Sequence, residues 1–118
     1  MKAMPIHEGA FSVLLVFECN PRDSERLSQA LGEFIETRMR LHAGFLSALV
    51  YVSEDATKVV ELFQWARAED WETYRSSPDG REAVGRLAGR SPKIEFLELT
   101  RAIGALPPGA LGPALAEG

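Results

Sequence analysis

Residues 45–65 decide the fold: Phe45-Leu-Ser-Ala-Leu-Val-Tyr-Val52, the polar turn Ser53-Glu-Asp-Ala-Thr57, and Lys58-Val-Val-Glu-Leu-Phe-Gln-Trp65. Two strand-like runs around a polar turn predict a β-hairpin. Neither run alternates cleanly between polar and apolar residues. Successive residues of a strand point to opposite sides of a sheet, so apolar side chains are expected on both sides. The sheet is therefore expected to be apolar on both faces, whereas a small antiparallel sheet normally leaves one face in water.

Strand and helix signals continue on both sides of this hairpin. An apolar strand is expected at 11–18, followed by a helix at about 23–41 in which apolar residues recur at helical spacing. After the hairpin, a short helix is expected at 68–76, further helical turns at 79–87, and a mixed strand at 94–99 that suits a sheet edge. The order β-α-β-β-α-β predicts an α+β fold of the ferredoxin-like type.

One domain is expected at residues 10–103, with a loose leader at 1–9 and a tail rich in Gly, Pro and Ala at 104–118. The tail is expected to be flexible or to lie across a neighbour. The helices of a ferredoxin-like fold cover one face of the sheet, so the other apolar face has no cover within the chain. Because two-fold dimers are the commonest assembly, we expect a homodimer with these open sheet faces in contact, a dimeric α+β barrel.

Composition argues against several classes of function. The 118 residues carry a formal net charge of -4, which provides no basic patch for nucleic acid. No apolar run approaches the roughly 20 residues that span a bilayer, so no membrane partner is expected. The single cysteine, Cys19, rules out an internal disulfide and a cysteine-based zinc site. The sequence has no glycine-rich phosphate-binding loop and no His, Cys, Asp or Glu residues at the spacing of metal ligands, so no cofactor or metal is expected. The cytoplasm is the default compartment.

Glu61 is an acidic residue inside an apolar strand, between Val60 and Leu62. By the parity of the strand it shares a face with Phe63 and Trp65. Burial of a carboxylate is costly unless the group is paired or protonated, and a pKa raised toward neutrality would suit a general base. The alternative is a structural ion pair, for which the sequence offers three arginines: Arg38, Arg67 and Arg75.

Aromatic side chains gather on the hairpin and on the helix that follows it. They can stack against a flat aromatic substrate, or they can simply fill the space between sheet and helices; this holds for Tyr51, Trp65 and Trp71. His42 is expected at the end of the first helix, where the helix dipole favours a cation. The residues expected to contact a substrate are Trp71, Tyr74, Arg75, Phe63 and Phe34.

Several segments are similar to those of a known family. They are Gly44-Phe45-Leu46-Ser47-Ala48, Val59-Val60-Glu61-Leu62-Phe63-Gln64-Trp65, Glu69-Asp70-Trp71-Glu72-Thr73-Tyr74 and Ser77-Pro78. Over roughly residues 11–101 the chain resembles the antibiotic biosynthesis monooxygenase family, whose members adopt the dimeric α+β barrel fold. Haem-degrading members need a histidine on the helix after the third strand, and this chain has none after His42.

Within that family the chain resembles small cofactor-independent oxygenases, which convert an anthrone-like aromatic polyketide to a quinone with O2. The resemblance implies a substrate pocket lined by Tyr51, Trp65 and Trp71. Glu61 would then be the base, with Tyr51 and Trp65 as hydrogen-bond donors to the substrate. Two other functions stay open at this point: a polyketide cyclase on the same fold, and a non-catalytic dimer that binds a small ligand.

Overall fold

Four antiparallel strands form one sheet in the order β2-β3-β1-β4. The computed structural model describes residues 8–87 and 90–106. Its strands are β1 (Phe11–Glu18), β2 (Phe45–Val52), β3 (Lys58–Trp65) and β4 (Lys93–Glu98). The β2–β3 hairpin predicted from the sequence is present, and the mixed strand β4 lies at the opposite edge. The strand order and the interleaved helices confirm the ferredoxin-like α+β fold.

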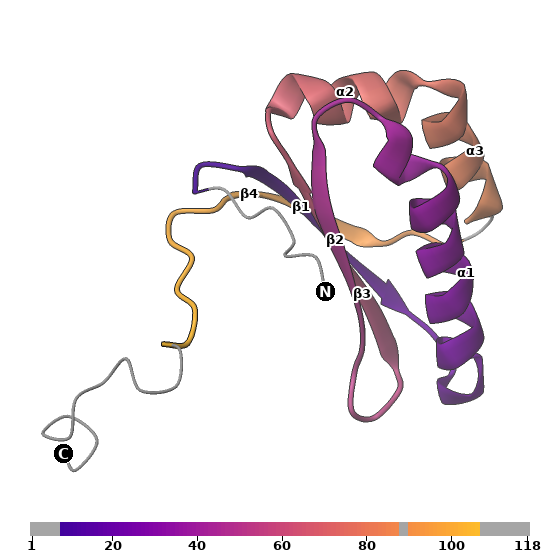
Figure 1. The fold of residues 1–118 in the computed structure, drawn as a ribbon. Coiled ribbons are helices and arrows are strands. Elements are labelled where there is room, and N and C mark those ends of the chain that lie inside the picture. The colour runs from indigo at the N-terminus through magenta and orange to yellow at the C-terminus, as the bar shows by residue number, and fades with distance from the viewer. Residues whose placement is uncertain (1–7, 88–89, 107–118) are drawn as a thin grey trace, which may run out of the picture.

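All helices lie on one side of the sheet (Figure 1). They are η1 (Pro21–Asp23), α1 (Ser24–Thr37), η2 (Met39–Leu41), α2 (Ala68–Ser76) and α3 (Pro78–Arg86), where η marks a short 3-10 turn. In α1 the residues that recur at helical spacing form the apolar stripe that packs on the sheet; they are Leu27, Leu31, Phe34 and Ile35.

The first helix is shorter than its sequence pattern predicts. A helix was expected at 23–41, but α1 ends at Thr37 because Arg38 leaves the helical region, with φ -127° and ψ -64°. The next residues form the 3-10 turn η2, in which Met39 stays buried. Because the apolar spacing continues through this turn, hydrophobic periodicity does not reveal the break. The last strand also begins one residue earlier than expected, at Lys93.

The strand register assigns each side chain to one of two sheet faces. The helix-covered face holds the buried core and is lined by Phe11, Val13, Leu15, Phe17, Val59, Glu61, Phe63 and Trp65. The other face, here called the open face, has no helix of residues 8–87 and 90–106 over it (Figure 1). The apolar side chains at its centre are Leu14, Val16, Leu49, Val60 and Leu62. The sheet is therefore apolar on both sides, as expected.

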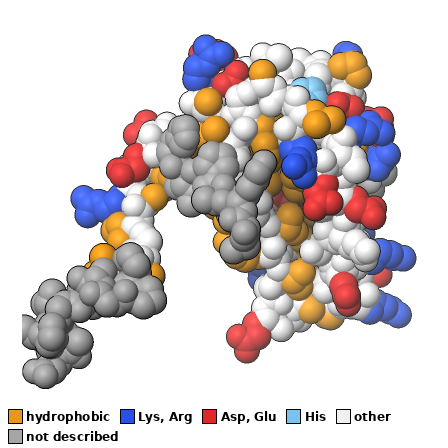
Figure 2. Space-filling view, viewed as in Figure 1, with side chains coloured by type: hydrophobic (Ala, Val, Ile, Leu, Met, Phe, Trp, Pro, Cys, Tyr) orange, Lys and Arg blue, Asp and Glu red, His pale blue; other side chains and the backbone are white. Residues whose placement is uncertain are grey.

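Charged side chains lie mainly over the helices, whereas hydrophobic side chains gather toward the middle of the molecule (Figure 2). Most of the expected leader, and the tail from residue 107 on, lie outside the described residues. The end of the leader is joined to the sheet, because Gly9 N–H donates to the Leu99 carbonyl oxygen at 2.5 Å. Residues 104–106 are exposed and without regular structure.

Two glycines are expected to respond to alanine substitution with opposite signs. Gly44 has φ +85°, and an added Cβ would collide with the Asp70 side chain. Gly44→Ala should therefore lower the free energy of unfolding by about 2–4 kcal/mol. Gly32 lies inside α1 with open space around it, so Gly32→Ala should raise that free energy by about 0.5–1 kcal/mol. Urea denaturation of both variants checks this, and a Gly44→Ala variant as stable as wild type would contradict it.

Candidate active site

A cavity of about 650 Å³ lies between the helix-covered face of the sheet and α1, α2 and α3. It is in the size range of small-molecule sites, about 300–1,000 Å³. Apolar side chains dominate its wall, including Leu15, Leu27, Leu31, Phe34, Ile35, Met39, Phe63, Trp71, Tyr74, Val84, Leu87 and Ile94. The one acidic side chain in the lining is Glu61. Four arginines also line the cavity: Arg75, Arg81, Arg86 and Arg90. The space is therefore suited to a largely apolar ligand that meets one carboxyl group and arginine side chains.

Glu61 is buried in the sheet floor of this cavity, with 4% of its surface exposed. Its neighbours across the sheet are Leu15 on β1 and Val50 on β2. Because burial removes water from the carboxylate and no charged partner compensates, the pKa of Glu61 rises from 4.5 to about 7. The carboxyl group is thus able to take up and release a proton near neutral pH.

The structural ion pair considered for Glu61 does not form. Each of the three candidate arginines pairs with other acids: Arg38 with Asp79 and Glu82, Arg67 with Asp70, and Arg75 with Glu72. These pairs hold the helices and their ends together. That alternative is therefore wrong, and Glu61 is left facing the cavity.

Three aromatic rings line one wall of the site, and a fourth packs behind them. Trp71 and Tyr74 of α2 line the cavity and have ring centroids 6.0 Å apart, and Phe63 of β3 lies 6.1 Å from Trp71. Trp65 is behind them, 5.4 Å from Tyr74 and 6.1 Å from Trp71. A flat aromatic ligand can therefore stack against rings that are already packed in place.

Two polar atoms of this wall are buried without a hydrogen-bond partner in the described residues, the Tyr74 hydroxyl and Trp71 Nε1. Burial, with the nearby charges of Asp79 and Glu61, raises the pKa of Tyr74 to about 12, so its hydroxyl keeps its proton. An unpaired buried donor costs about 1–3 kcal/mol. A ligand oxygen that reached either donor on binding would remove this cost.

Trp65 belongs to the core rather than to the cavity lining. Its side chain is fully buried, packs edge-on against Phe45 at 5.5 Å, and supports the rings of α2. Its Nε1 is also without a partner in the described residues. Of the two interpretations left open for Trp65, core filling is the one that the structure supports.

Tyr51 is not part of this site, and its grouping with Glu61 and Trp65 was wrong. In the hairpin Tyr51 is opposite Val60, whereas Val50 is opposite Glu61. Residues directly opposite in an antiparallel pair share a face, so Tyr51 points to the open face, where 53% of its surface is exposed. The family resemblance implied that Tyr51 lines the pocket, whereas the strand pairing puts its side chain on the other face of the sheet.

The last two expected substrate contacts lie at the cavity wall. Phe34 of α1 is buried, and the guanidinium groups of Arg38 and Arg86 lie 5.4 and 5.1 Å from its ring centre. Arg75 is at the outer margin, mostly exposed and paired with Glu72 at 2.9 Å. Phe34 is therefore placed to contact a ligand, whereas Arg75 is placed at the entrance.

The α2–α3 corner is held by contacts that sequence reasoning missed. Asp79 accepts from Arg38 at 3.0 Å and contacts His42 Nε2 at 2.9 Å, and these two partners hold the pKa of Asp79 below its ordinary value. The His42 ring meets Tyr74 edge-on at 4.9 Å. His42 lies beyond the end of α1, in extended conformation, so the helix-dipole interpretation was wrong. The corner fixes Tyr74 over the cavity.

Metal and membrane functions find no support in the described part of the chain. Residues 8–87 and 90–106 contain no group of three or more His, Cys, Asp or Glu side chains that could hold a metal ion. No helix in these ranges is long and apolar enough to cross a membrane.

Comparison with known proteins connects this geometry to an enzyme family. The chain is 30% identical over 104 residues to the tetracenomycin-F1 monooxygenase of Streptomyces glaucescens, with 83% of this chain and 88% of that protein aligned. The chain belongs to the antibiotic biosynthesis monooxygenase family. It is therefore an oxygenase. No protein-family model matches it, so the family assignment rests on this relative.

Solved structures share the fold of this family member. The monooxygenase from the gene ActVA-Orf6 of Streptomyces coelicolor, solved with the ligand nanaomycin D, aligns with a TM-score of 0.69 at 24% identity, covering 84% of this chain and 92% of that one. A putative antibiotic biosynthesis monooxygenase from Deinococcus radiodurans aligns with a TM-score of 0.68 at 18% identity, covering 82% and 99%. At 24% and 18% identity, these alignments show that the proteins share a fold.

Proposed function

We propose that this family member is a cofactor-independent monooxygenase that oxidises an anthrone-like aromatic polyketide with O2, inside the cavity beneath α1, α2 and α3. The observation that carries the proposal is the lone buried carboxyl group of Glu61 in an apolar chamber, with a pKa of about 7. The tetracenomycin F1 in the name of one relative and the nanaomycin D bound to one structural neighbour support an aromatic polyketide as the substrate class. The reaction is placed in the cytoplasm, as the single cysteine favours.

In this reaction the substrate supplies the electrons. The Glu61 carboxylate removes a proton from the methylene carbon of the anthrone and leaves an electron-rich anion. The anion passes one electron to O2, and the radical and superoxide combine to form a carbon–oxygen bond. Protonation of the outer peroxide oxygen and loss of the second C–H proton break the O–O bond, giving a carbonyl and water. One oxygen atom enters the product and the other leaves as water.

Hydrogen-bond donors of the aromatic wall can stabilise the charged intermediate. Negative charge in the deprotonated substrate is shared with its ring oxygens, and the Tyr74 hydroxyl and Trp71 Nε1 are the donors without partners that can receive such an oxygen. Donors held in place before the reaction stabilise the charge without reorganisation. The apolar lining keeps water away from the anion and from superoxide. Trp65 acts here as a positioning residue behind the two donors.

The open face is proposed to be buried in a homodimer. Its central apolar side chains include Leu14, Leu49 and Leu62, and none of the helices that the structure describes covers them. Large exposed apolar patches on soluble proteins usually mark interaction sites. A two-fold pairing of open faces would cover this surface and leave both cavities, which lie on the opposite face, free for substrate.

Oxygen consumption is the experiment that tests the proposed reaction. Protein treated with a metal chelator is mixed with an anthrone, and O2 uptake and quinone formation are followed together. We expect one O2 consumed for each quinone formed, at a rate unchanged by the chelator. The two other functions considered from the sequence are outcomes of the same assay: a cyclase would transform a poly-β-ketone without taking up O2, and a non-catalytic binder would leave both substrates unchanged.

The two tyrosines offer a matched pair of variants. Tyr74→Phe removes a buried hydroxyl that has no hydrogen-bond partner in the described residues, so the free energy of unfolding should rise by up to about 1–3 kcal/mol while turnover falls by about 10–100-fold. Tyr51→Phe makes the same chemical change on the open face and should leave turnover within about threefold of wild type. Steady-state O2 uptake gives both values, and a larger loss for Tyr51→Phe than for Tyr74→Phe would refute the assignment of the site.

A further inference from the structure

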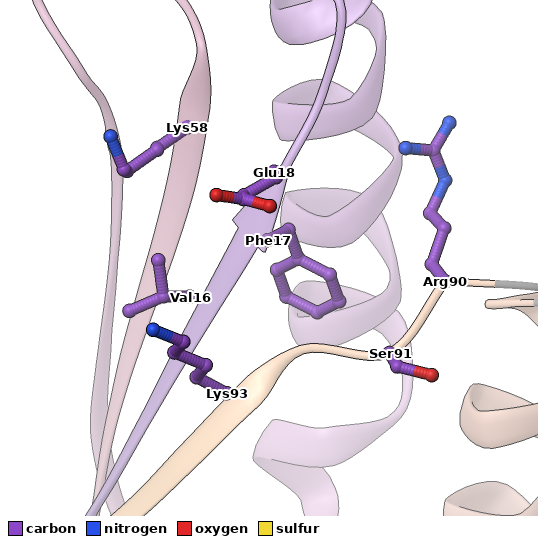
Figure 3. A pocket seen from close by; sticks show the side chains of 7 residues that line it. All are labelled: Val16, Phe17, Glu18, Lys58, Arg90, Ser91 and Lys93. Atoms are coloured by element: carbon purple, nitrogen blue, oxygen red, sulfur yellow. The ribbon is translucent and has the colours of Figure 1, made fainter.

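A second, smaller pocket lies at the end of the sheet where β1 finishes (Figure 3). It measures about 330 Å³ and is lined by Val16, Phe17, Glu18, Lys58, Arg90, Ser91 and Lys93. The lining comes from three strands and from the segment that leads into β4. Of its four charged side chains three are cationic, in a protein whose net charge is -4. The pocket is therefore a local positive site on an acidic molecule.

Backbone geometry leaves a hydrogen-bond donor beside this pocket. The β1–β4 ladder stops at the pair Val16–Lys93, and the next pair in that register would be Glu18 with Ser91. Cys19 N–H donates to Thr57 toward the β3 side, so Glu18 N–H points to the β4 side, because neighbouring amides of a strand alternate. Within the described residues no backbone hydrogen bond joins Glu18 to Ser91, and the pocket occupies that gap.

The cations of the pocket are available to a ligand. Among residues 8–87 and 90–106, none of Lys58, Arg90 and Lys93 has an acid within 4.0 Å in an ion pair. Glu18 is the one opposing charge in the lining, and its carboxylate lies on the same side of β1 as the two lysines, whereas Arg90 lies on the other side (Figure 3). One lysine is enough to balance it, which leaves a net positive charge for an anion.

The small pocket and the large cavity are neighbours with a common wall. Arg90 and Ser91 line both of them. Glu61, the one acid of the large cavity, lies on its sheet floor. A ligand that stacks on the aromatic wall can thus extend past Arg90 toward the small pocket. A polar substituent at that end would meet cations, while its ring system stays among apolar side chains.

We propose that the small pocket is an anion subsite for a carboxylate substituent of the aromatic molecule bound in the large cavity, so that this enzyme selects acidic over neutral aromatic substrates. The inference rests on the proposed function of the large cavity. Arg90 and Ser91, which line both spaces, and the backbone N–H of Glu18 are the groups that receive the carboxylate. Lys93, which is opposite Val16 on the open-face side of the sheet end, contributes its positive charge. Glu18 opposes the anion through its own charge.

Binding of unreactive quinones tests this proposal without turnover. Anthraquinone-2-carboxylate and the isosteric anthraquinone-2-carboxamide are titrated into the protein at low salt, and quenching of tryptophan emission reports occupancy near Trp71. We expect the acid to bind at least about tenfold more tightly than the amide. Arg90→Gln and Lys93→Gln should each reduce this preference by about threefold, and high salt should reduce it strongly. Binding of the amide should be unchanged throughout.

Two further variants decide whether the effect is local. Glu18→Gln removes the opposing charge and should increase the preference for the acid, whereas Arg101→Gln, which changes an exposed cation beyond the far end of β4, should leave it unchanged. Inorganic phosphate should compete with the acid and not with the amide. Equal binding of acid and amide to wild type overturns the proposal, as does a preference that survives in the Arg90→Gln, Lys93→Gln double variant. Phosphate binding without any preference for the acid also overturns it.

The quinone-binding experiment and the O2-uptake experiment test the two proposals independently. A quinone is already oxidised, so its binding does not depend on O2 chemistry. If anthrone gives no O2 uptake while the acid preference and its dependence on Arg90 persist, the oxygenase proposal fails and the subsite stands. If uptake is normal and acid and amide bind alike, the subsite fails alone.

Discussion

Glu61→Gln should lower turnover by about 10²–10⁴-fold, the range that a general base contributes, and should at the same time make the protein more stable above neutral pH. The amide has nearly the shape of the carboxylate but cannot take the substrate proton. In wild type, kcat/KM should rise with pH through about 7, where the Glu61 carboxyl group loses its proton, and then level off. The variant should show only a low rate that lacks this rise.

The stability effect follows from the raised pKa. The pKa of Glu61 is 4.5 when exposed and about 7 in the folded protein, so the folded state binds the proton more tightly than the unfolded state. Its contribution to stability is fully present below pH 4.5 and is lost as pH rises through about 7. Above that pH the buried charge costs about 3 kcal/mol, and Glu61→Gln removes this cost.

Urea denaturation at two pH values measures the effect. At about pH 8 the variant should be more stable than wild type by up to about 3 kcal/mol, and at about pH 4 the two should agree within error. Glu36→Gln changes an exposed acid on α1 and should leave the difference between the pH values unchanged. A Glu61→Gln variant that keeps wild-type turnover, or is no more stable at about pH 8, would show that Glu61 is not a buried base.

Leu62→Asp should convert a dimer into a monomer. Leu62 lies in the middle of the open face, opposite Leu49 and Leu14 on the neighbouring strands. In a two-fold dimer of open faces, the substitution would bury one carboxylate from each protomer between apolar side chains, and burying unpaired charge costs several kcal/mol. Light scattering after gel filtration should give twice the chain mass for wild type and the chain mass for the variant.

Leu41→Asp is the matched control for this experiment. Leu41 belongs to η2 on the helix side and has 78% of its surface exposed, so the same change in charge and size should leave the dimer intact. A wild-type protein that is monomeric at micromolar concentration would remove the dimer proposal. A Leu62→Asp protein that remains dimeric would place the contact on another surface.

Local patterns in the sequence predicted the hairpin, the order of the elements and the position of Glu61. The two runs around the polar turn appear as β2 and β3, and strand parity correctly put Glu61 on one face with Phe63 and Trp65. These features depend on residues close together in the chain. That is why one sequence is enough to predict them.

Features that depend on register and on distant contacts were not predicted. Whether Tyr51 shares a face with Glu61 depends on the pairing of Val50 with Glu61, which the length of the β2–β3 turn determines. The contact of His42 with Asp79 joins residues 37 positions apart, and no local pattern connects them. The unpartnered Tyr74 hydroxyl likewise becomes visible only when α2 is packed on the sheet.

The most direct test of the account is a crystal structure of the protein with anthraquinone bound. We expect the quinone in the cavity between the sheet and α1, α2 and α3, stacked on the rings of α2. One quinone oxygen should lie about 3 Å from the Tyr74 hydroxyl or Trp71 Nε1, and Glu61 should face the central ring. A quinone bound on the open face beside Tyr51, with the cavity under the helices filled only by water, would contradict it.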